Sequence, residues 1–410
     1  MAKRFVTLCV VAAAMAVLTA GCGDDGCPKP VILVLVYPGA VNVEICQTAS
    51  IAAQVTGGKT GDVDWYINDV LGGGSALGTV TQTNPATYTA PESFPPVDVQ
   101  IVVKAVARED TSKVGSCLIN LGLTKIYVNC TAGHDQGGTG CITRPFKSIT
   151  RGLAAAGAGM TVLVAPGVYD ATNGEVFPIT VANGVSLVGQ NWETTIIRGH
   201  SESTFDRTAV FLCGMHSALR RFTLEEGPTI QDAWQYGVFV LEEATGTVID
   251  SIRMSERTRI SNLTMIGTTD VTVENCRFVI DDHEHKGGGI ASVVSNTGTV
   301  IRNCVVSGFG EGIFFNDSSD ALIEGCTMEN NQIGVNMCCY NAPDSNPNPD
   351  LGGGGRGSAG GNIIRNNDIC GLRNPTSNAI YARFNTWTHN PPVAGQDYCT
   401  GEGTGSIVWQ

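Results

Sequence analysis

Apolar and polar residues alternate with a period of two between residues 41 and 122. The clearest runs lie at 49–55, 63–67, 99–107 and 117–121, and turns that contain Gly or Pro separate them. Alternation of this kind is typical of strands that have one face on a core and the other in water. The regular spacing of these short strands predicts a small β-sandwich over residues 41–122.

An internal repeat fills the C-terminal part of the chain. Residues 271–276, 299–304 and 321–326 share one pattern that ends in Cys, and weaker echoes lie at 218–222 and 363–367. A unit of roughly 22 residues is too small to bury its own apolar face, whereas stacked units bury a continuous core. The repeat therefore predicts a parallel β-helix over residues 123–410. Parallel crossover connections predict that it is right-handed.

The only strongly helical segment lies at the start of this repeat region. Ile149, Leu153 and Ala156 share one face of a helix predicted over 149–156, and Ser148 is its expected N-cap. Such a helix would cover the open N-terminal end of the β-helix and prevent edge pairing there. A leucine-rich-repeat solenoid is the rival architecture, but its L-x-x-L-x-L register is absent.

Side-chain directions follow from the repeat. Ile301 and Ile323 should point into the solenoid, whereas Arg302 and Glu324, one residue further along each strand, should face solvent. Three cysteines that recur in one register should form a buried ladder of free thiols: Cys276, Cys304 and Cys326. Asn residues just before the aligned position should hydrogen-bond to neighbouring coils: Asn275, Asn303 and Asn366.

The N-terminus has the order of regions that is typical of an export signal. Lys3 and Arg4 precede an apolar stretch at 5–18, which Thr19-Ala20-Gly21-Cys22 follows. This order resembles the lipobox of bacterial lipoproteins. The resemblance implies a signal peptide over 1–21, acylation at Cys22 and, because Gly23 follows it, an outer-membrane lipoprotein on the periplasmic or cell-surface side. An ordinary cleaved signal or an uncleaved anchor is the alternative. Residues 22–40 are expected to form a tether.

Composition narrows the class of protein. The chain of 410 residues has 51 Gly and only 15% charged residues, which favours an all-β protein rich in turns. Its net charge of −13 argues against a nucleic-acid partner, because such proteins need basic surfaces for phosphates. No run of 18 apolar residues follows the leader, which excludes a polytopic membrane protein.

Cysteine usage also points to export. Fifteen cysteines indicate an oxidising compartment. Cys130 and Cys141 bracket a Gly-rich loop that a disulfide would staple, and Cys46 and Cys117 are candidates to link the ends of the sandwich. A late group is expected to form disulfides rather than a zinc site, since it has no C-x₂-C pair or spaced His: Cys338, Cys339, Cys370 and Cys399.

Two further resemblances support the domain order. The stretch from Val63-Asp64-Trp65 to Tyr88-Thr89-Ala90-Pro91 resembles bacterial immunoglobulin-like modules, which implies a spacer with Trp65 buried. Residues 124–410 resemble a bacterial domain-of-unknown-function family in the pectin-lyase-like β-helix superfamily. The segments that carry this resemblance are 126–128, 145–150, 167–169, 177–179, 184–189, 349–354, 361–362 and 385–387. The predicted fold class is thus all-β, an immunoglobulin-like β-sandwich followed by a right-handed parallel β-helix with an N-terminal capping helix.

The densest ionisable cluster is Asp281–Lys286. Asp282, His283 and His285 are its candidate catalytic residues. His283 and His285 alternate on one extended segment, so they would point the same way and could supply either two metal ligands or an acid and a base. A solvated loop at a coil corner is the alternative. The hydrolase motifs Asn-Thr-Asp, Gly-His-Gly and Arg-Ile-Lys are absent, as is the lyase pattern of Arg near Pro and a second Arg. No metal site or cofactor is expected, and Ca²⁺ enters only if the protein is a lyase.

Aromatic residues offer a second kind of chemistry. They would either stack on sugar rings or pack inside the solenoid: Trp234, Tyr236, Phe314, Phe315, Tyr381, Phe384 and Trp387. These observations predict a lipid-anchored surface or periplasmic protein whose sandwich spaces a non-catalytic β-helix from the membrane. The β-helix would bind a polysaccharide or a cell-surface protein. A polysaccharide lyase or glycoside hydrolase is the alternative.

Overall fold

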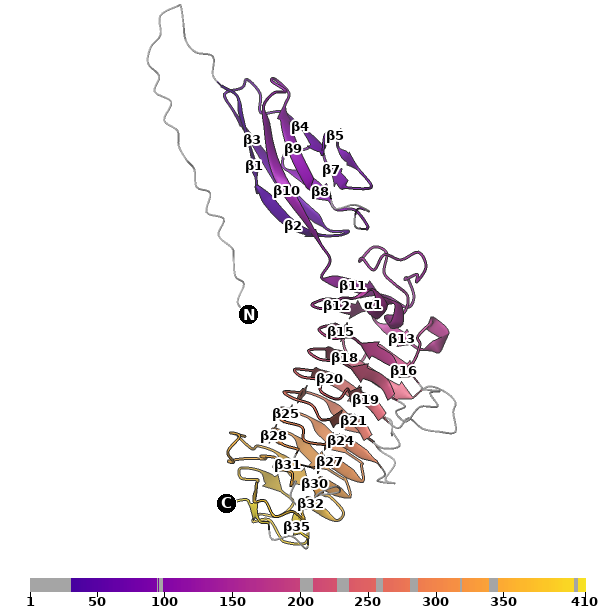
Figure 1. Cartoon of the computed structure of the whole chain (residues 1–410), viewed down its shortest axis with the longest axis vertical. Coiled ribbons are helices and arrows are strands. Elements are labelled where there is room, and N and C mark those ends of the chain that lie inside the picture. Colours follow the sequence, from indigo (N-terminus) through magenta and orange to yellow (C-terminus); the bar gives the residue numbers. More distant parts are fainter. Residues whose placement is uncertain are drawn as a thin grey trace, which may run out of the picture.

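The computed structural model shows a small β-sandwich followed by a long stack of short strands (Figure 1). The sandwich, in indigo and purple, lies at one end, and the stack continues from it to the yellow C-terminal end. The residues that the structure describes are 31–93, 95, 99–199, 209–226, 236–255, 261–280, 287–317, 319–338, 346–401 and 405–410.

Two five-stranded sheets form the sandwich. One has the order β1 (Leu33–Tyr37), β3 (Thr48–Thr56), β8 (Ala86–Thr89), β7 (Gly78–Val80) and β6 (Gly73–Gly74). The other has the order β2 (Ala40–Glu44), β10 (Val114–Gly122), β9 (Ile101–Ala107), β4 (Val63–Ile67) and β5 (Val70–Leu71). The two inner faces share one core that contains the buried Trp65 and Tyr88. Strand β1 and the first residue of β2 lie inside the segment 22–40 that the sequence assigned to a tether, because Val34 and Val36 pack into this core.

The described residues that follow the sandwich form a parallel β-helix, as predicted. A large parallel sheet follows its length through β11 (Lys125–Val128), β12 (Thr161–Val164), β15 (Ser186–Gly189), β18 (Ala218–Glu226), β20 (Val248–Met254), β23 (Arg277–Val279), β26 (Val305–Ser307), β29 (Thr327–Glu329), β31 (Ile363–Arg365) and β34 (Thr386–Trp387). Strands that branch from this path are β13 (Gly167–Tyr169), β16 (Thr195–Gly199), β22 (Thr272–Glu274), β25 (Thr299–Arg302) and β28 (Ala321–Glu324).

A second parallel sheet forms another side of the coils. Its order is β14 (Ile179–Val181), β17 (Ala209–Cys213), β19 (Tyr236–Val240), β21 (Ser261–Ile266), β24 (Gly288–Val293), β27 (Glu311–Asn316), β30 (Ile333–Cys338), β32 (Cys370–Asn374) and β35 (Tyr398–Thr400). Near the C-terminus β33 (Ile380–Tyr381) pairs with β36 (Ile407–Val408). One hydrophobic core runs through the solenoid from Ile126 to Trp387.

Helix α1 (Ile149–Ala155) lies at the first coil, where the sequence placed a cap. The hydroxyl of Ser148 accepts a hydrogen bond from the Arg151 backbone N–H at 3.1 Å, which confirms the predicted N-cap. The carboxylate of Glu175, in the loop after a short 3₁₀ helix (Ala171–Asn173), accepts from the Ile149 and Thr150 backbone N–H groups. These acceptors satisfy donors that a helix N-terminus leaves unpaired.

The interior of the coils follows the predicted register. Ile301 and Ile323 are fully buried and pair across β25 and β28, whereas Arg302, the next residue, faces outward. The three thiols of the ladder are buried and free, as predicted: Cys276, Cys304 and Cys326. The Cys304 backbone N–H donates to Cys326 Sγ at 3.4 Å, so the thiols also help to satisfy backbone groups of neighbouring coils.

The residue before each interior position has a left-handed backbone. In successive coils this column consists of Arg221, Ser251, Asn275, Asn303 and Gly325, whose φ values are 61°, 56°, 55°, 53° and 62°. Asn and Gly tolerate this conformation better than other residues, which explains why the sequence repeats Asn there. The Asn275 side chain donates to the carboxylate of Asp250 in the preceding coil, as predicted, whereas the Asn303 and Asn366 side chains make no such hydrogen bond within the described residues.

The disulfides differ from the predicted pairs. Cys46 is bonded to Cys141, and Cys117 and Cys130 are free thiols. The Cys117 side chain is fully buried in the sandwich core, whereas Cys46 lies in a left-handed turn after β2. Spacing along the chain could not show that the loop before α1 folds back against this turn. In the late group, Cys370 is bonded to Cys399, and Cys339 lies outside the described residues.

Candidate functional site

Several predicted site residues lie outside the part of the chain that the structure describes. These are the lipidation site Cys22, the candidate catalytic residues Asp282, His283 and His285, and the aromatic residue Trp234. Within the described ranges, no group of three or more His, Cys, Asp and Glu side chains is placed to hold a metal ion. No helix in those ranges is long and apolar enough to cross a membrane.

A row of outward-facing residues crosses the coils of the large sheet and changes character along its length. In register order it consists of Tyr127, Leu163, Val188, Arg220, Asp250, Glu274, Arg302 and Glu324. The last five are charged, and they include the ion pairs Arg220–Asp250 at 2.9 Å and Arg302–Glu274 at 2.6 Å. The first three are apolar or aromatic. Because the later coils carry charged residues in this row, the β-helix fold does not require the first three residues of the row to be apolar.

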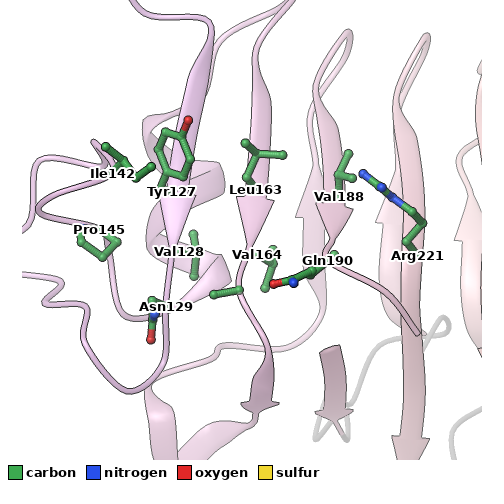
Figure 2. Close-up of a pocket in the computed structure, with 12 residues that line it drawn as sticks. Tyr127, Val128, Asn129, Ile142, Pro145, Leu163, Val164, Val188, Gln190 and Arg221 are labelled. Carbon is green, nitrogen blue, oxygen red and sulfur yellow. The ribbon is translucent and has the colours of Figure 1, made fainter. Parts of the chain in front are cut away.

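The apolar start of the row forms the floor of a pocket of about 400 Å³, which we call the outer groove. Figure 2 shows Tyr127, Leu163 and Val188 side by side on neighbouring strands. Twelve residues line the groove: Tyr127, Val128, Asn129, Ile142, Pro145, Leu163, Val164, Ala165, Val188, Gly189, Gln190 and Arg221. A mainly apolar cavity of this size with a few polar groups is typical of a small-molecule site.

Arg221 closes the end of the outer groove. It occupies the left-handed column, where the following coils have Ser, Asn, Asn and Gly. A long residue in this conformation costs about 1 kcal/mol or more, and such strain is concentrated at functional sites. Its guanidinium extends toward Val188 (Figure 2). It makes no ion pair or side-chain hydrogen bond with the described residues.

Other polar groups of the outer groove are also available to a ligand. Neither the Tyr127 hydroxyl nor the Gln190 side-chain amide has a side-chain hydrogen bond in the described part of the chain. The carbonyl oxygen of the Asn129 side chain, by contrast, accepts from the Thr131 and Ala132 backbone N–H groups and shapes the loop. The open donors therefore gather around the apolar floor, with one cation among them.

The sandwich holds one wall of the outer groove in place. Ile142, which is 53% exposed, and Pro145 belong to the loop that precedes α1. The Cys46–Cys141 disulfide ties this loop to the sandwich, and Arg144 pairs with Glu92 of the sandwich at 2.9 Å. The spacing of the two cysteines did not reveal this arrangement. A signal for the groove did exist in the apolar outward residues of the first three coils, but it becomes visible only when the coils are in register.

The described aromatic candidates differ in exposure, and Tyr236 and Phe314 are half-buried. Phe315 and Trp387 are buried in the solenoid, in agreement with interior packing. Tyr381 is 36% exposed and Phe384 is 71% exposed, so this part of the set is available on the surface. These two residues lie near the C-terminal end of the β-helix, several coils away from the outer groove.

The fold defines a class of protein, the parallel β-helices. A solved structure named "Rhamnogalacturonan lyase" matches with a TM-score of 0.51 and 16% identity, over 63% of this chain and 72% of that chain, a likeness that shows the fold alone. Residues 131–394 match the model of the family described as "Protein of unknown function (DUF1565)", and the chain belongs to this family. No curated protein matches the sequence.

Proposed function

We propose that this protein is an exported lipoprotein whose β-helix binds a carboxylate-bearing glycan in the outer groove without cleaving it. The observation that carries the proposal is the groove itself, where an apolar floor meets one unpaired guanidinium. The Cys46–Cys141 and Cys370–Cys399 disulfides agree with export, because such bonds persist in oxidising compartments.

The chemistry of the outer groove suits an acidic sugar. A guanidinium binds a carboxylate through charge-assisted hydrogen bonds, which Arg221 is free to make. The Tyr127 ring and the aliphatic side chains of Leu163 and Val188 suit the apolar face of a sugar ring. Neighbouring strands lie about 4.8 Å apart, so a floor that crosses three coils accommodates a short oligosaccharide. Rhamnogalacturonan contains galacturonic acid, which carries a carboxylate. We choose it as the first polymer to test because a solved structure with a similar fold is named "Rhamnogalacturonan lyase".

The binding test compares wild type with Arg221→Asn. Asn is the residue that later coils carry in the same left-handed column, so this variant should keep the fold. We expect calorimetric titration with rhamnogalacturonan oligosaccharides to show at least tenfold weaker binding for the variant, since hydrogen bonds to charged groups contribute about 1.5–3 kcal/mol. Carboxyl-reduced oligosaccharides are the matched ligand control and should bind both proteins equally weakly. Equal affinity of the two proteins for the acidic ligand would contradict the proposal.

The same samples address the enzymatic alternative, a polysaccharide lyase or glycoside hydrolase that uses Asp282, His283 and His285. We expect neither unsaturated-product absorbance nor new reducing ends during incubation, with or without Ca²⁺. Products that disappear in a His283→Ala variant would replace the binding proposal with the enzymatic one.

The location forms part of the proposal. Cys22 would carry the lipid in the outer membrane, and the sandwich would space the β-helix from the bilayer. Several acyl chains at about 0.8 kcal/mol per buried CH₂ would make this anchoring permanent. Labelled palmitate should enter the wild type but not Cys22→Ala. Equal incorporation into both would refute lipidation at this residue while leaving the outer groove untouched.

A further inference from the structure

A second feature of the surface departs from the repeat. Phe384 has a left-handed backbone with φ of 63°, yet its ring is 71% exposed. An aromatic residue gains little from packing when it is this exposed, and a left-handed backbone is unfavourable for a residue that has a Cβ. Packing within the fold therefore does not explain why Phe is at this position. A ligand that covers the exposed ring would explain it.

The loop that supports Phe384 is built around a buried carboxylate. Asp350, only 3% exposed, accepts hydrogen bonds from four backbone N–H groups: Gly352 at 2.9 Å, Gly354 at 3.0 Å, Arg356 at 3.1 Å and Ser358 at 3.3 Å. These bonds fold residues 350–358 into a compact loop. Because so many donors converge on one side chain, the loop is a rigid support.

This loop is bonded directly to the segment that carries the aromatic residues. The backbone N–H of Leu351 donates to the carbonyl of Tyr381 at 2.8 Å, and that of Arg383 donates to the carbonyl of Gly352 at 3.1 Å. A Cβ on Gly352 would lie 2.0 Å from the carbonyl oxygen of Arg383, so the close approach requires Gly there. A Cβ on Gly353 would lie 3.2 Å from Phe384 Cε2, which places one edge of the aromatic ring against the loop.

Polar groups surround this support. A pocket of about 430 Å³ is lined by Asn348, Pro349, Asp350, Gly354, Gly355, Arg356, Asn378, Ala379 and Tyr381. The Arg383 guanidinium carbon lies 5.7 Å from the centre of the Tyr381 ring. Arg383 Nε is buried and has no hydrogen-bond partner in the described part of the chain. Arg356, by contrast, pairs with Asp320.

We propose that Phe384, Tyr381 and Arg383 form a second carbohydrate-binding site, which takes a neutral sugar ring of an oligosaccharide. The apolar face of the ring would cover Phe384, as sugar rings do on exposed aromatic side chains. Neighbouring hydroxyl groups of the oligosaccharide would contact the polar side chains of the pocket. The ligand is neutral because the charged side chains around it already have partners: Arg356 pairs with Asp320, the Asp350 carboxylate accepts four backbone N–H groups, and the Arg383 guanidinium lies near the Tyr381 ring. This site is independent of the outer groove and does not rest on the function proposed for it.

The test uses purified full-length protein on an array of neutral and acidic glycans, followed by calorimetry with the neutral glycan that binds most strongly. Phe384→Asn removes the ring and places a residue that tolerates left-handed backbone, so its melting temperature should be unchanged or higher. We expect about tenfold weaker binding of the neutral glycan. Phe384→Trp keeps a stacking surface and should retain binding.

Arg221→Asn is the control for the outer groove and should bind the neutral glycan as wild type does. Wild-type affinity of Phe384→Asn for every neutral glycan, or no neutral glycan bound by wild type, would overturn this proposal. Loss of acidic-glycan binding in Arg221→Asn alone bears only on the outer groove, so the two proposals fail separately.

Discussion

The middle coils of the β-helix and its two ends carry different residue types at their outward-facing and left-handed positions. In the middle, the outward row carries charged residues in ion pairs, and the left-handed column carries Ser, Asn and Gly. At the N-terminal end the outward row is apolar, and Arg221 occupies the left-handed column. Toward the C-terminal end a left-handed backbone carries the exposed Phe384. Because the middle coils show what stacking requires, the residues that depart from that pattern are the ones for which we propose ligands.

The largest expected effect concerns the interior of the middle coils. The hydrogen bond with the Cys276 side chain, together with burial, raises the pKa of the Cys304 thiol well above its usual value. Since the thiolate is the reactive form, Cys304 should resist a thiol reagent at pH 8 in the folded protein and react completely in denaturant. Mass mapping measures this protection. Rapid labelling of folded protein at Cys304, or a Cys276–Cys304 disulfide, would show that the interior ladder is wrong.

The next effect is on stability. Ile301→Asp buries an unpaired carboxylate between coils, so we expect the free energy of unfolding to fall by several kcal/mol. Thermal melts would show either a large decrease in melting temperature or a failure to fold. Ile323→Asp should behave in the same way, and a mild effect of both changes would break the assignment of inward and outward positions.

Exchanging the residues of the left-handed column between the two regions tests what this column contributes to stability. Asn303→Arg places in a middle coil the residue that the outer groove has, and Arg221→Asn makes the reverse change. We expect the first to lower the free energy of unfolding by about 1 kcal/mol and the second to raise it by about 1 kcal/mol. Chemical denaturation of both variants tests this. A destabilised Arg221→Asn protein would mean that the Arg221 side chain stabilises the fold rather than serving a ligand.

The smallest effect is expected on the outside of the middle coils. Arg302→Ser removes an exposed ion pair with Glu274, and such pairs contribute about 0–1 kcal/mol. The melting temperature should change little, and less still at high salt, where the pair is screened. A loss comparable to that of Ile301→Asp would show that the outward row supports the coil as much as the interior does.

Sequence alone determined the repeating features of this protein. The recurrence of apolar residues and Cys predicted the parallel β-helix, the buried Ile301 and Ile323 and the free thiols, and the helical pattern at 149–156 predicted the cap with Ser148. Each of these depends on which way a side chain points within its own strand or helix. Local period determines that direction, so the sequence is sufficient.

Which residues of different coils lie together could be seen only in the tertiary structure. The outer groove depends on the alignment of Tyr127, Leu163 and Val188 across strands that loops of unequal length separate. The Cys46–Cys141 bond depends likewise on how the loop before α1 folds against the sandwich. These contacts arise between segments far apart in the chain, and no local period encodes how such segments meet.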